Sequence, residues 1–162
     1  MRYQMKQKFF SWGTDFTIQD ANGNDAFLVD GAGFSLGARL TFQDLAGKEL
    51  VRIEQRLFSW SPTYEIHRGD QLIATVEKEA FTLFSCSFTV DVPGPDDLQA
   101  DGDFLDLEYE FKRGARKIAT VSKQWFSLSD TYGIDIAEGE DDVLLLASAV
   151  VIDMACHQDR ND

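Results

Sequence analysis

The sequence predicts a mostly β protein: a closed antiparallel barrel of about twelve strands around one hydrophobic C-terminal helix. Three observations lead to this fold. Apolar and polar residues alternate in many short segments, glycine-containing turns separate those segments, and the last apolar run is too long for a strand. The 162 residues include 13 Phe, 4 Tyr and 3 Trp but only 3 Pro, a balance typical of β-structure. At this length we expect a single domain spanning residues 1–162.

An internal repeat organises the chain. Residues 50–59, 73–82 and 118–127 align without gaps on an aliphatic residue, a second one three positions later, then Gln or Lys, then Phe followed by Ser or Thr. A weaker fourth copy runs from Met5 to Ser11. An aromatic residue and a short alternating segment follow each copy. The irregular spacing of the copies indicates hairpins reused within one barrel rather than an open solenoid.

The alternating segments are bounded by turns such as Asn22-Gly23, Ala46-Gly47 and Arg68-Gly69, where glycine supplies positive φ. Residues 93–102 read as one long loop. The resulting eleven strands cover residues 3–10, 14–20, 25–30, 34–43, 48–58, 61–68, 71–79, 83–92, 103–112, 115–125 and 130–136.

The helix is expected over residues 141–157, because the apolar run 143–152 follows several carboxylates. Asp141 suits the N-cap, where its charge also meets the helix dipole. A helix that is apolar on every face must be enclosed on every face. About twelve strands spaced about 4.8 Å apart close into a barrel about 24 Å across, and a helix is about 10–12 Å wide. The space left on each side fits one layer of side chains, so the helix can fill the barrel.

Nearly the whole chain resembles the LURP-one-related (YxjI-like) family, which shares the Tubby C-terminal-like fold with Tubby proteins and phospholipid scramblases. The segments that carry the resemblance are residues 34–37, 40–50, 57–66 and 130–134 leading into 143–153. The resemblance implies a twelve-stranded barrel around a central C-terminal helix. It implies no activity, although Tubby proteins bind phosphoinositides and scramblases are linked to calcium and lipid movement.

Composition narrows the classes of function. With 15 Lys and Arg against 28 Asp and Glu, the net charge is −13, which argues against nucleic-acid binding. The run 143–152 would span about 15 Å as a helix, half of a bilayer, so we expect no transmembrane segment. The N-terminus lacks the apolar region of a signal peptide, so a cytoplasmic location is expected. Cys86 and Cys156 are expected to be buried thiols, and no cofactor is predicted.

The sequence contains two candidate binding sites and one weak catalytic motif. Four bases in a row of six residues, Lys112, Arg113, Arg116 and Lys117, form a possible site for a phospholipid head group. They directly follow an acidic tract, and if Arg113-Gly114 is the hairpin turn, Glu110 lies opposite Lys117 and neutralises part of this charge.

The second candidate is a calcium site before the helix, with ligands among Asp130, Asp135, Asp141 and Asp142, although their spacing is not that of an EF-hand loop. Ser35 lies in a Gly-x-Ser-x-Gly pattern, but a strand-like run follows it where a nucleophile elbow needs a helix.

We therefore expect a non-enzymatic barrel that binds a protein or a small ligand on its surface. The alternative from another class is an effector of phosphoinositides or anionic lipids, acting through residues 112–117 and possibly assisted by calcium. A hydrolase using Ser35 is a more remote alternative.

Overall fold

The structure is a computed structural model that describes residues 1–6, 15–31, 39–79, 87–126 and 131–158. Within these residues the chain forms twelve strands followed by one helix, α1 (Asp142–Gln158). The strands are β1 (Arg2–Lys6), β2 (Phe16–Asp20), β3 (Asp25–Gly31), β4 (Arg39–Gln43), β5 (Glu49–Gln55), β6 (Thr63–Arg68), β7 (Gln71–Lys78), β8 (Phe88–Asp91), β9 (Leu98–Asp103), β10 (Glu108–Arg113), β11 (Arg116–Ser122) and β12 (Thr131–Ile136).

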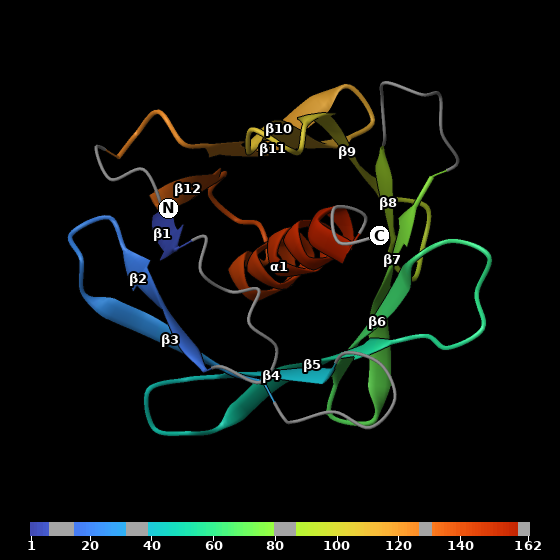
Figure 1. Ribbon diagram of the computed structural model, residues 1–162, viewed down its shortest axis with the longest axis horizontal. Coiled ribbons are helices and arrows are strands. Elements are labelled where there is room, and N and C mark those ends of the chain that lie inside the picture. Colours follow the sequence, from blue (N-terminus) through green and yellow to red (C-terminus); the bar gives the residue numbers. More distant parts are fainter. Residues whose placement is uncertain (7–14, 32–38, 80–86, 127–130, 159–162) are drawn as a thin grey trace.

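The strands form one closed antiparallel barrel (Figure 1). Each strand pairs with its neighbours in the sequence, and β1 closes the ring by pairing with β12, with Tyr3 opposite Ile134. Every strand in the described part of the chain therefore has a neighbour on both sides, and none of them is an edge strand. The predicted fold class, a closed barrel of about twelve strands with a single C-terminal helix, is confirmed. The segments identified in the sequence number eleven, because they do not include β9.

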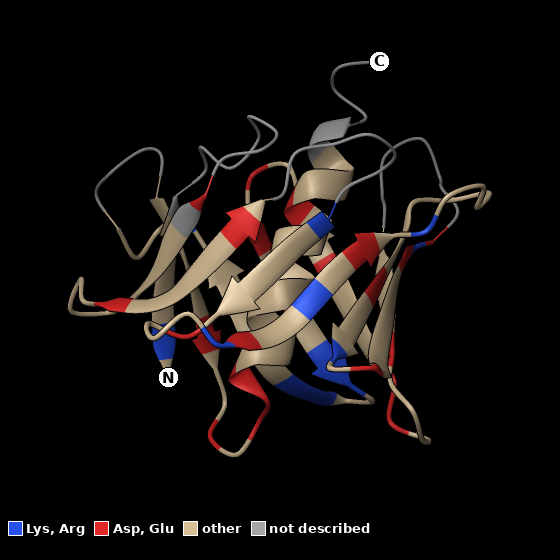
Figure 2. Ribbon diagram, turned by 90° about the horizontal axis from the view of Figure 1, so that it is seen from below, with Lys and Arg blue, Asp and Glu red and all other residues tan. Residues whose placement is uncertain are grey.

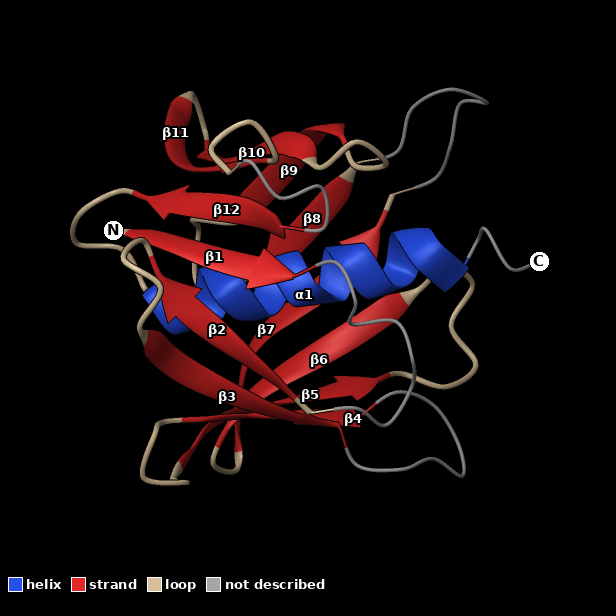
Figure 3. Ribbon diagram, turned by 60° about the vertical axis from the view of Figure 1, so that its left-hand side comes forward, coloured by secondary structure: helices blue, strands red, loops and turns tan. Residues whose placement is uncertain are grey.

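The helix α1 runs lengthwise through the barrel and fills it (Figure 3). Leu145, Leu146, Ala147, Ala149 and Val151 are at most 1% exposed, although they point in different directions around the helix. Inward-facing residues of the strands, such as Ile53, Ile66 and Val76, are buried in the same core. The helix has no polar face because every face of it is packed against the barrel wall.

The repeat corresponds to hairpins, as the sequence predicted. Its three clear copies run along β5, β7 and β11, and each of these strands pairs with the strand that follows it. Because successive strands alternate in direction, residues 56–62, 104–107 and 123–126 all lie at the end of the barrel where α1 finishes. We call this end the C-terminal rim. The opposite end, where α1 begins, is the N-terminal rim and carries residues 69–70, 114–115 and 137–141.

The predicted long loop over residues 93–102 is wrong. Strand β9 begins at Leu98 and pairs with both β8 and β10. Its inward residues Leu98 and Ala100 are buried, but they are the only two apolar residues in an acidic stretch that also contains glycine and proline. That signal is too short for alternation to stand out. The β5 strand also ends earlier than predicted, at Gln55 rather than at residue 58.

Figure 2 shows acidic segments spread over the strands and the connections between them, with basic segments among them. Among the described residues, no helix is long and apolar enough to cross a membrane.

Candidate functional site at the N-terminal rim

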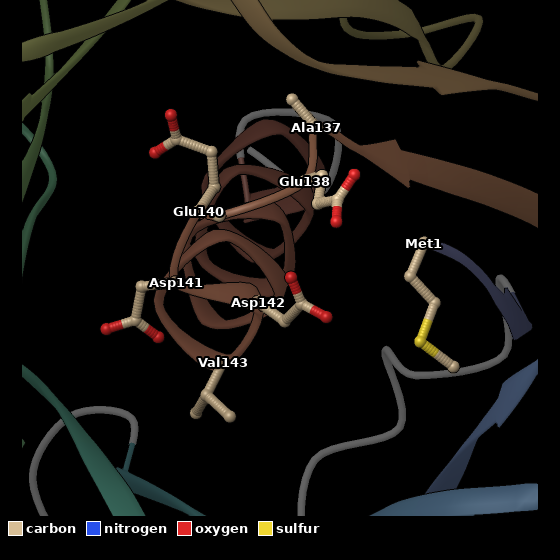
Figure 4. Close-up of a pocket in the computed structure, with 8 residues that line it drawn as sticks. Met1, Ala137, Glu138, Glu140, Asp141, Asp142 and Val143 are labelled. Carbon is tan, nitrogen blue, oxygen red and sulfur yellow. The ribbon is translucent and has the colours of Figure 1, made fainter.

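A pocket of about 610 Å³ lies at the N-terminal rim, where the chain leaves β12 and enters α1. It is lined by Met1 and by residues 137–143, which include four carboxylates. Figure 4 shows that Glu140 and Asp141 point to the opposite side of the helix from Glu138 and Asp142. The pocket is therefore acidic, but its carboxylates diverge.

Three of these carboxylates tie the start of the helix to the barrel wall. Arg113 Nη1 lies 2.9 Å from Glu140 Oε1, and Arg68 Nη2 lies 3.0 Å from Asp141 Oδ2. The Tyr3 hydroxyl donates a hydrogen bond of 2.6 Å to Asp142 Oδ2. These contacts join the start of α1 to β10, β6 and β1, so they fix the helix from three sides.

Asp141 also caps the helix, as predicted. Its Oδ1 atom accepts a hydrogen bond of 3.1 Å from the backbone N–H of Leu144. This bond satisfies one of the N–H groups that have no partner within the first helical turn. The same carboxylate thus serves as both the N-cap and the partner of Arg68.

Burial and polar contacts at the N-terminal rim shift the pKa values of Tyr3 and Arg113. The pKa of Tyr3 is raised mainly by burial and next by the neighbouring Asp142 carboxylate. The hydrogen bond to Glu140 raises the pKa of Arg113. Glu140 has only 10% of its side chain exposed, so its charge depends on the Arg113 guanidinium for compensation.

In the described part of the chain, the predicted calcium ligands do not converge on one site. Asp135 is on β12 and pairs with Arg2 at 3.7 Å, while Asp141 and Asp142 hold Arg68 and Tyr3. Asp130 lies outside the described residues. Within the described part of the chain, no three His, Cys, Asp or Glu side chains lie where they could hold one metal ion together. The calcium site stays a prediction.

The predicted basic site is a hairpin between β10 and β11. Lys112 Nζ lies 2.8 Å from Glu110 Oε1, and Lys117 Nζ lies 3.6 Å from Glu110 Oε2. The hydrogen bond from Lys112 is the main reason that the pKa of Glu110 is lowered. With Arg113 bound to Glu140, Arg116 is the one base of the four that forms no ion pair within the described part of the chain. Whether this turn binds a phosphate stays a prediction.

The predicted register of this hairpin is wrong. The turn residues are Gly114 and Ala115, not Arg113 and Gly114, so Lys112 lies opposite Lys117 and a bulge follows. Gly114 has φ +60° and provides the left-handed residue of the turn. Glu110 still reaches Lys117 because both side chains lie on the same face of the hairpin and Glu110 is a diagonal neighbour.

In the sequence, the basic turn and the acidic segment before the helix are separate candidate sites. In the structure, the ion pair between Arg113 and Glu140 joins them. Strand alternation offered a signal for this contact. Tyr109 and Phe111 face inward, so Arg113 is next on the inward face of β10. Arg68 occupies the equivalent last position of β6, after the buried Tyr64 and Ile66.

A second polar group lies deeper, inside the barrel. The carboxylate of Asp153 on α1 is buried and accepts a hydrogen bond of 2.8 Å from the Tyr132 hydroxyl. Burial raises the pKa of Asp153 to about 7, although the Tyr132 bond and Lys123 act in the opposite direction. The Tyr109 hydroxyl is buried nearby without a hydrogen-bond partner in the described residues. The sequence alone does not reveal this group, because Asp153 only marks the end of the apolar run and its partner Tyr132 is 21 positions away in the chain.

Of the remaining candidate residues, Ser35 and Cys86 lie outside the described residues. Cys156 is a buried thiol on α1, as predicted.

A closed antiparallel barrel filled by its own C-terminal helix defines the class of protein. Residues 1–153 match the family model described as LURP-one-related, and the chain belongs to that family. It is 37% identical over 158 residues to the uncharacterized protein YxjI of Bacillus subtilis (strain 168), covering 98% of this chain and 95% of that protein. A crystal structure of an Arabidopsis thaliana protein shares the fold, with a TM-score of 0.66, 19% identity, and coverage of 99% of this chain and 92% of that one.

Proposed function

We propose that the protein is a non-enzymatic barrel that binds a protein or a small ligand on its outer surface. The observation that carries this proposal is the filled interior. Where many barrels hold a ligand, this one holds α1, whose central residues are at most 1% exposed. Binding is then left to the outer wall and the two rims.

The N-terminal rim supports a binding role better than a catalytic one. Three of its four carboxylates, those of Asp141, Glu140 and Asp142, are engaged by Arg68, Arg113 and Tyr3. A general acid or base needs a pKa near the working pH and access to a substrate. Carboxylates that are paired within the protein stabilise its structure, and their charge can attract a binding partner.

A titration of isotope-labelled protein, followed by NMR, tests the proposal. The probes are pools of short acidic, neutral and basic peptides and a pool of soluble fragments. We expect at least one pool to shift signals of outward-facing residues only. Shifts centred on the inward-facing residues of β5, β6 and β7 would contradict the proposal, as would silence from every pool. Turnover of an ester or phosphoester substrate that Ser35→Ala abolishes would contradict its non-enzymatic part.

The second candidate is an effector that binds phosphoinositides or anionic lipids through Lys112, Arg113, Arg116 and Lys117. The feature that favours it is the base Arg116, which is exposed at a turn and has no carboxylate within reach in the described residues. Co-sedimentation with neutral, anionic and phosphoinositide vesicles, with and without calcium, tests this candidate. Salt-sensitive binding that Arg116→Glu abolishes would support it. A dependence on calcium would point to the carboxylates around Asp135, Asp141 and Asp142. The cytoplasmic location stays a prediction of the sequence.

A further inference from the structure

The connection between β5 and β6 presents two aromatic side chains entirely to solvent. Phe58 and Trp60 have relative exposures of 103% and 107%, and Leu57 beside them is 44% exposed. The other large apolar side chains that are exposed in the described residues stand singly: Met1, Leu45, Leu72 and Leu105. We call residues 57–60 the aromatic loop.

The aromatic loop is held by hydrogen bonds. The N–H of Arg56 donates to the carbonyl of Thr63 at 2.8 Å and closes the loop at its base. Ser59 Oγ donates to the carbonyl of Ser61 at 2.7 Å, as does Thr63 Oγ1 at 3.0 Å. Within this frame Phe58 has φ +64°, a left-handed conformation that costs free energy for an aromatic residue. The backbone therefore carries strain while it directs Phe58 away from the protein.

The fold itself does not require this exposure. Phe126 stands at the same place in the repeat, after β11, and its ring packs on β12. A Cβ atom added to Gly133 would lie 2.6 Å from Phe126 Cε2. The phenylalanines at the same position of two repeat copies therefore differ in their surroundings: Phe126 lies on the barrel wall, whereas Phe58 is in solvent.

The wall beside the aromatic loop is acidic. A hollow of about 240 Å³ on the outside of β7 and β8 is lined by four carboxylates and by Arg56. The four are Glu77, Glu79, Asp91 and Asp97. Ser61 Oγ, one residue from Trp60, donates to Glu77 Oε1 at 3.0 Å, so the loop adjoins this hollow. The hydrogen bond and charge of Asp97 raise the pKa of Asp91, as expected where carboxylates crowd together.

We propose that the aromatic loop and this acidic hollow together bind a basic, apolar segment of a partner protein. Lys or Arg side chains of the segment would neutralise the hollow, and its apolar side chains would cover Phe58 and Trp60. Solvent-exposed tryptophan and aromatic anchors carry much of the binding energy at protein interfaces. Negative charge beside the aromatics disfavours an anionic membrane as the occupant. The proposal rests on surface binding as the proposed function and adds the place and the partner's chemistry.

The test uses a soluble, end-capped peptide of eight alternating Lys and Phe residues, and the same peptide with Glu in place of Lys. We expect calorimetry to detect salt-sensitive binding of the Lys peptide alone. Trp60→Ala should weaken it at least tenfold, while Leu105→Ala, which removes an exposed side chain elsewhere on the C-terminal rim, should leave it unchanged. Both side chains are exposed, so neither change should alter the thermal unfolding of the protein.

A charge-matched pair of variants separates the hollow from the overall charge of −13. Glu77→Gln with Asp91→Asn should weaken binding, whereas Asp25→Asn with Asp70→Asn, two exposed carboxylates away from the hollow, should not. No binding, or equal binding by Trp60→Ala, would overturn the inference. Sedimentation with phosphatidylcholine vesicles that Trp60→Ala abolishes would overturn it in favour of a membrane. If these results appear while another peptide or fragment pool still shifts outward-facing signals, the proposed function survives the failure.

Discussion

The hydroxyl of Tyr132 donates a hydrogen bond to the Oδ2 atom of Asp153, 2.8 Å away, in the interior of the barrel. One residue is on β12 and the other is on α1, so this bond joins the barrel wall to the helix that fills it. A carboxyl group is costly to bury, and hydrogen bonding offsets only part of that cost. The pair is therefore a point at which pH acts on the stability of the core.

Asp153 should make the protein less stable as pH rises. Burial raises its pKa from 3.8 to about 7, so the folded protein binds this proton more tightly than the unfolded chain does. The stabilisation is complete below pH 3.8, is lost between 3.8 and about 7, and stays lost above. At about 1.4 kcal/mol for each tenfold change in proton affinity, the loss is about 4 kcal/mol. Urea unfolding at several pH values measures it.

Asp153→Asn should remove this part of the pH dependence. Tyr132→Phe deletes the bond that lowers the pKa of Asp153, so it should shift the loss of stability to higher pH. If the stability of the wild-type protein and that of the Asp153→Asn variant depend on pH in the same way, the pKa of the Asp153 carboxyl is not raised.

Leu145→Asp should prevent folding. Leu145 is 1% exposed in the first turn of α1, inside the barrel, and burying an isolated charge there is costly. Far-UV circular dichroism and size-exclusion chromatography measure the outcome. Leu145→Met keeps the volume and should cost less than about 1.5 kcal/mol. A Leu145→Asp variant that melts normally would contradict the central position of the helix.

Gly102→Ala should disrupt the pairing of β9 with β10. A Cβ atom there would lie 2.6 Å from the carbonyl oxygen of Glu108 and from Cα of Tyr109, and the residue has φ +141°. Both atoms belong to the backbone and cannot turn away, so we expect a loss of about 2 kcal/mol or more. Thermal unfolding compares it with Gln99→Ala, an exposed change on the same strand. Equal melting of the two variants would contradict the role of β9.

Arg113→Ala and Arg116→Ala should differ although both remove a base from the same hairpin. Arg113 compensates the nearly buried Glu140 at 2.9 Å, so its loss should cost about 1–3 kcal/mol. Arg116 is exposed, and its loss should stay within about 0.5 kcal/mol. Chemical denaturation of both variants checks the difference. If Arg113→Ala is neutral and Glu140→Gln is too, the tie between hairpin and helix is unimportant.

Where strands alternate strongly, the sequence predicted them well. The repeat over residues 50–59, 73–82 and 118–127 marks β5, β7 and β11, because each copy carries apolar residues that are buried in the core. The helix bounds agree within one residue, since an uninterrupted apolar run with an acidic start has few other solutions. Strand β9 was missed because only Leu98 and Ala100 carry its pattern.

The candidate site was predicted less completely than the fold. The sequence identified Asp141 as the helix cap, because capping depends on residues three apart. It could not identify Arg68 or Tyr3 as partners of the carboxylates at the start of α1. Those contacts join residues 73 and 139 positions apart in the chain, and only closure of the barrel brings them together.

The sequence by itself determined all the elements of this protein except β9, because alternation and length depend on residues near one another in the chain. Tertiary structure alone decided which charges meet and which aromatic side chains stay in solvent. Phe58 and Phe126 occupy the same place in the repeat, yet only Phe126 packs on the barrel. The difference depends on a left-handed backbone at one position and on a glycine, Gly133, across the sheet from the other. Local pattern fixes which face a side chain takes, and packing over long distances fixes what it touches.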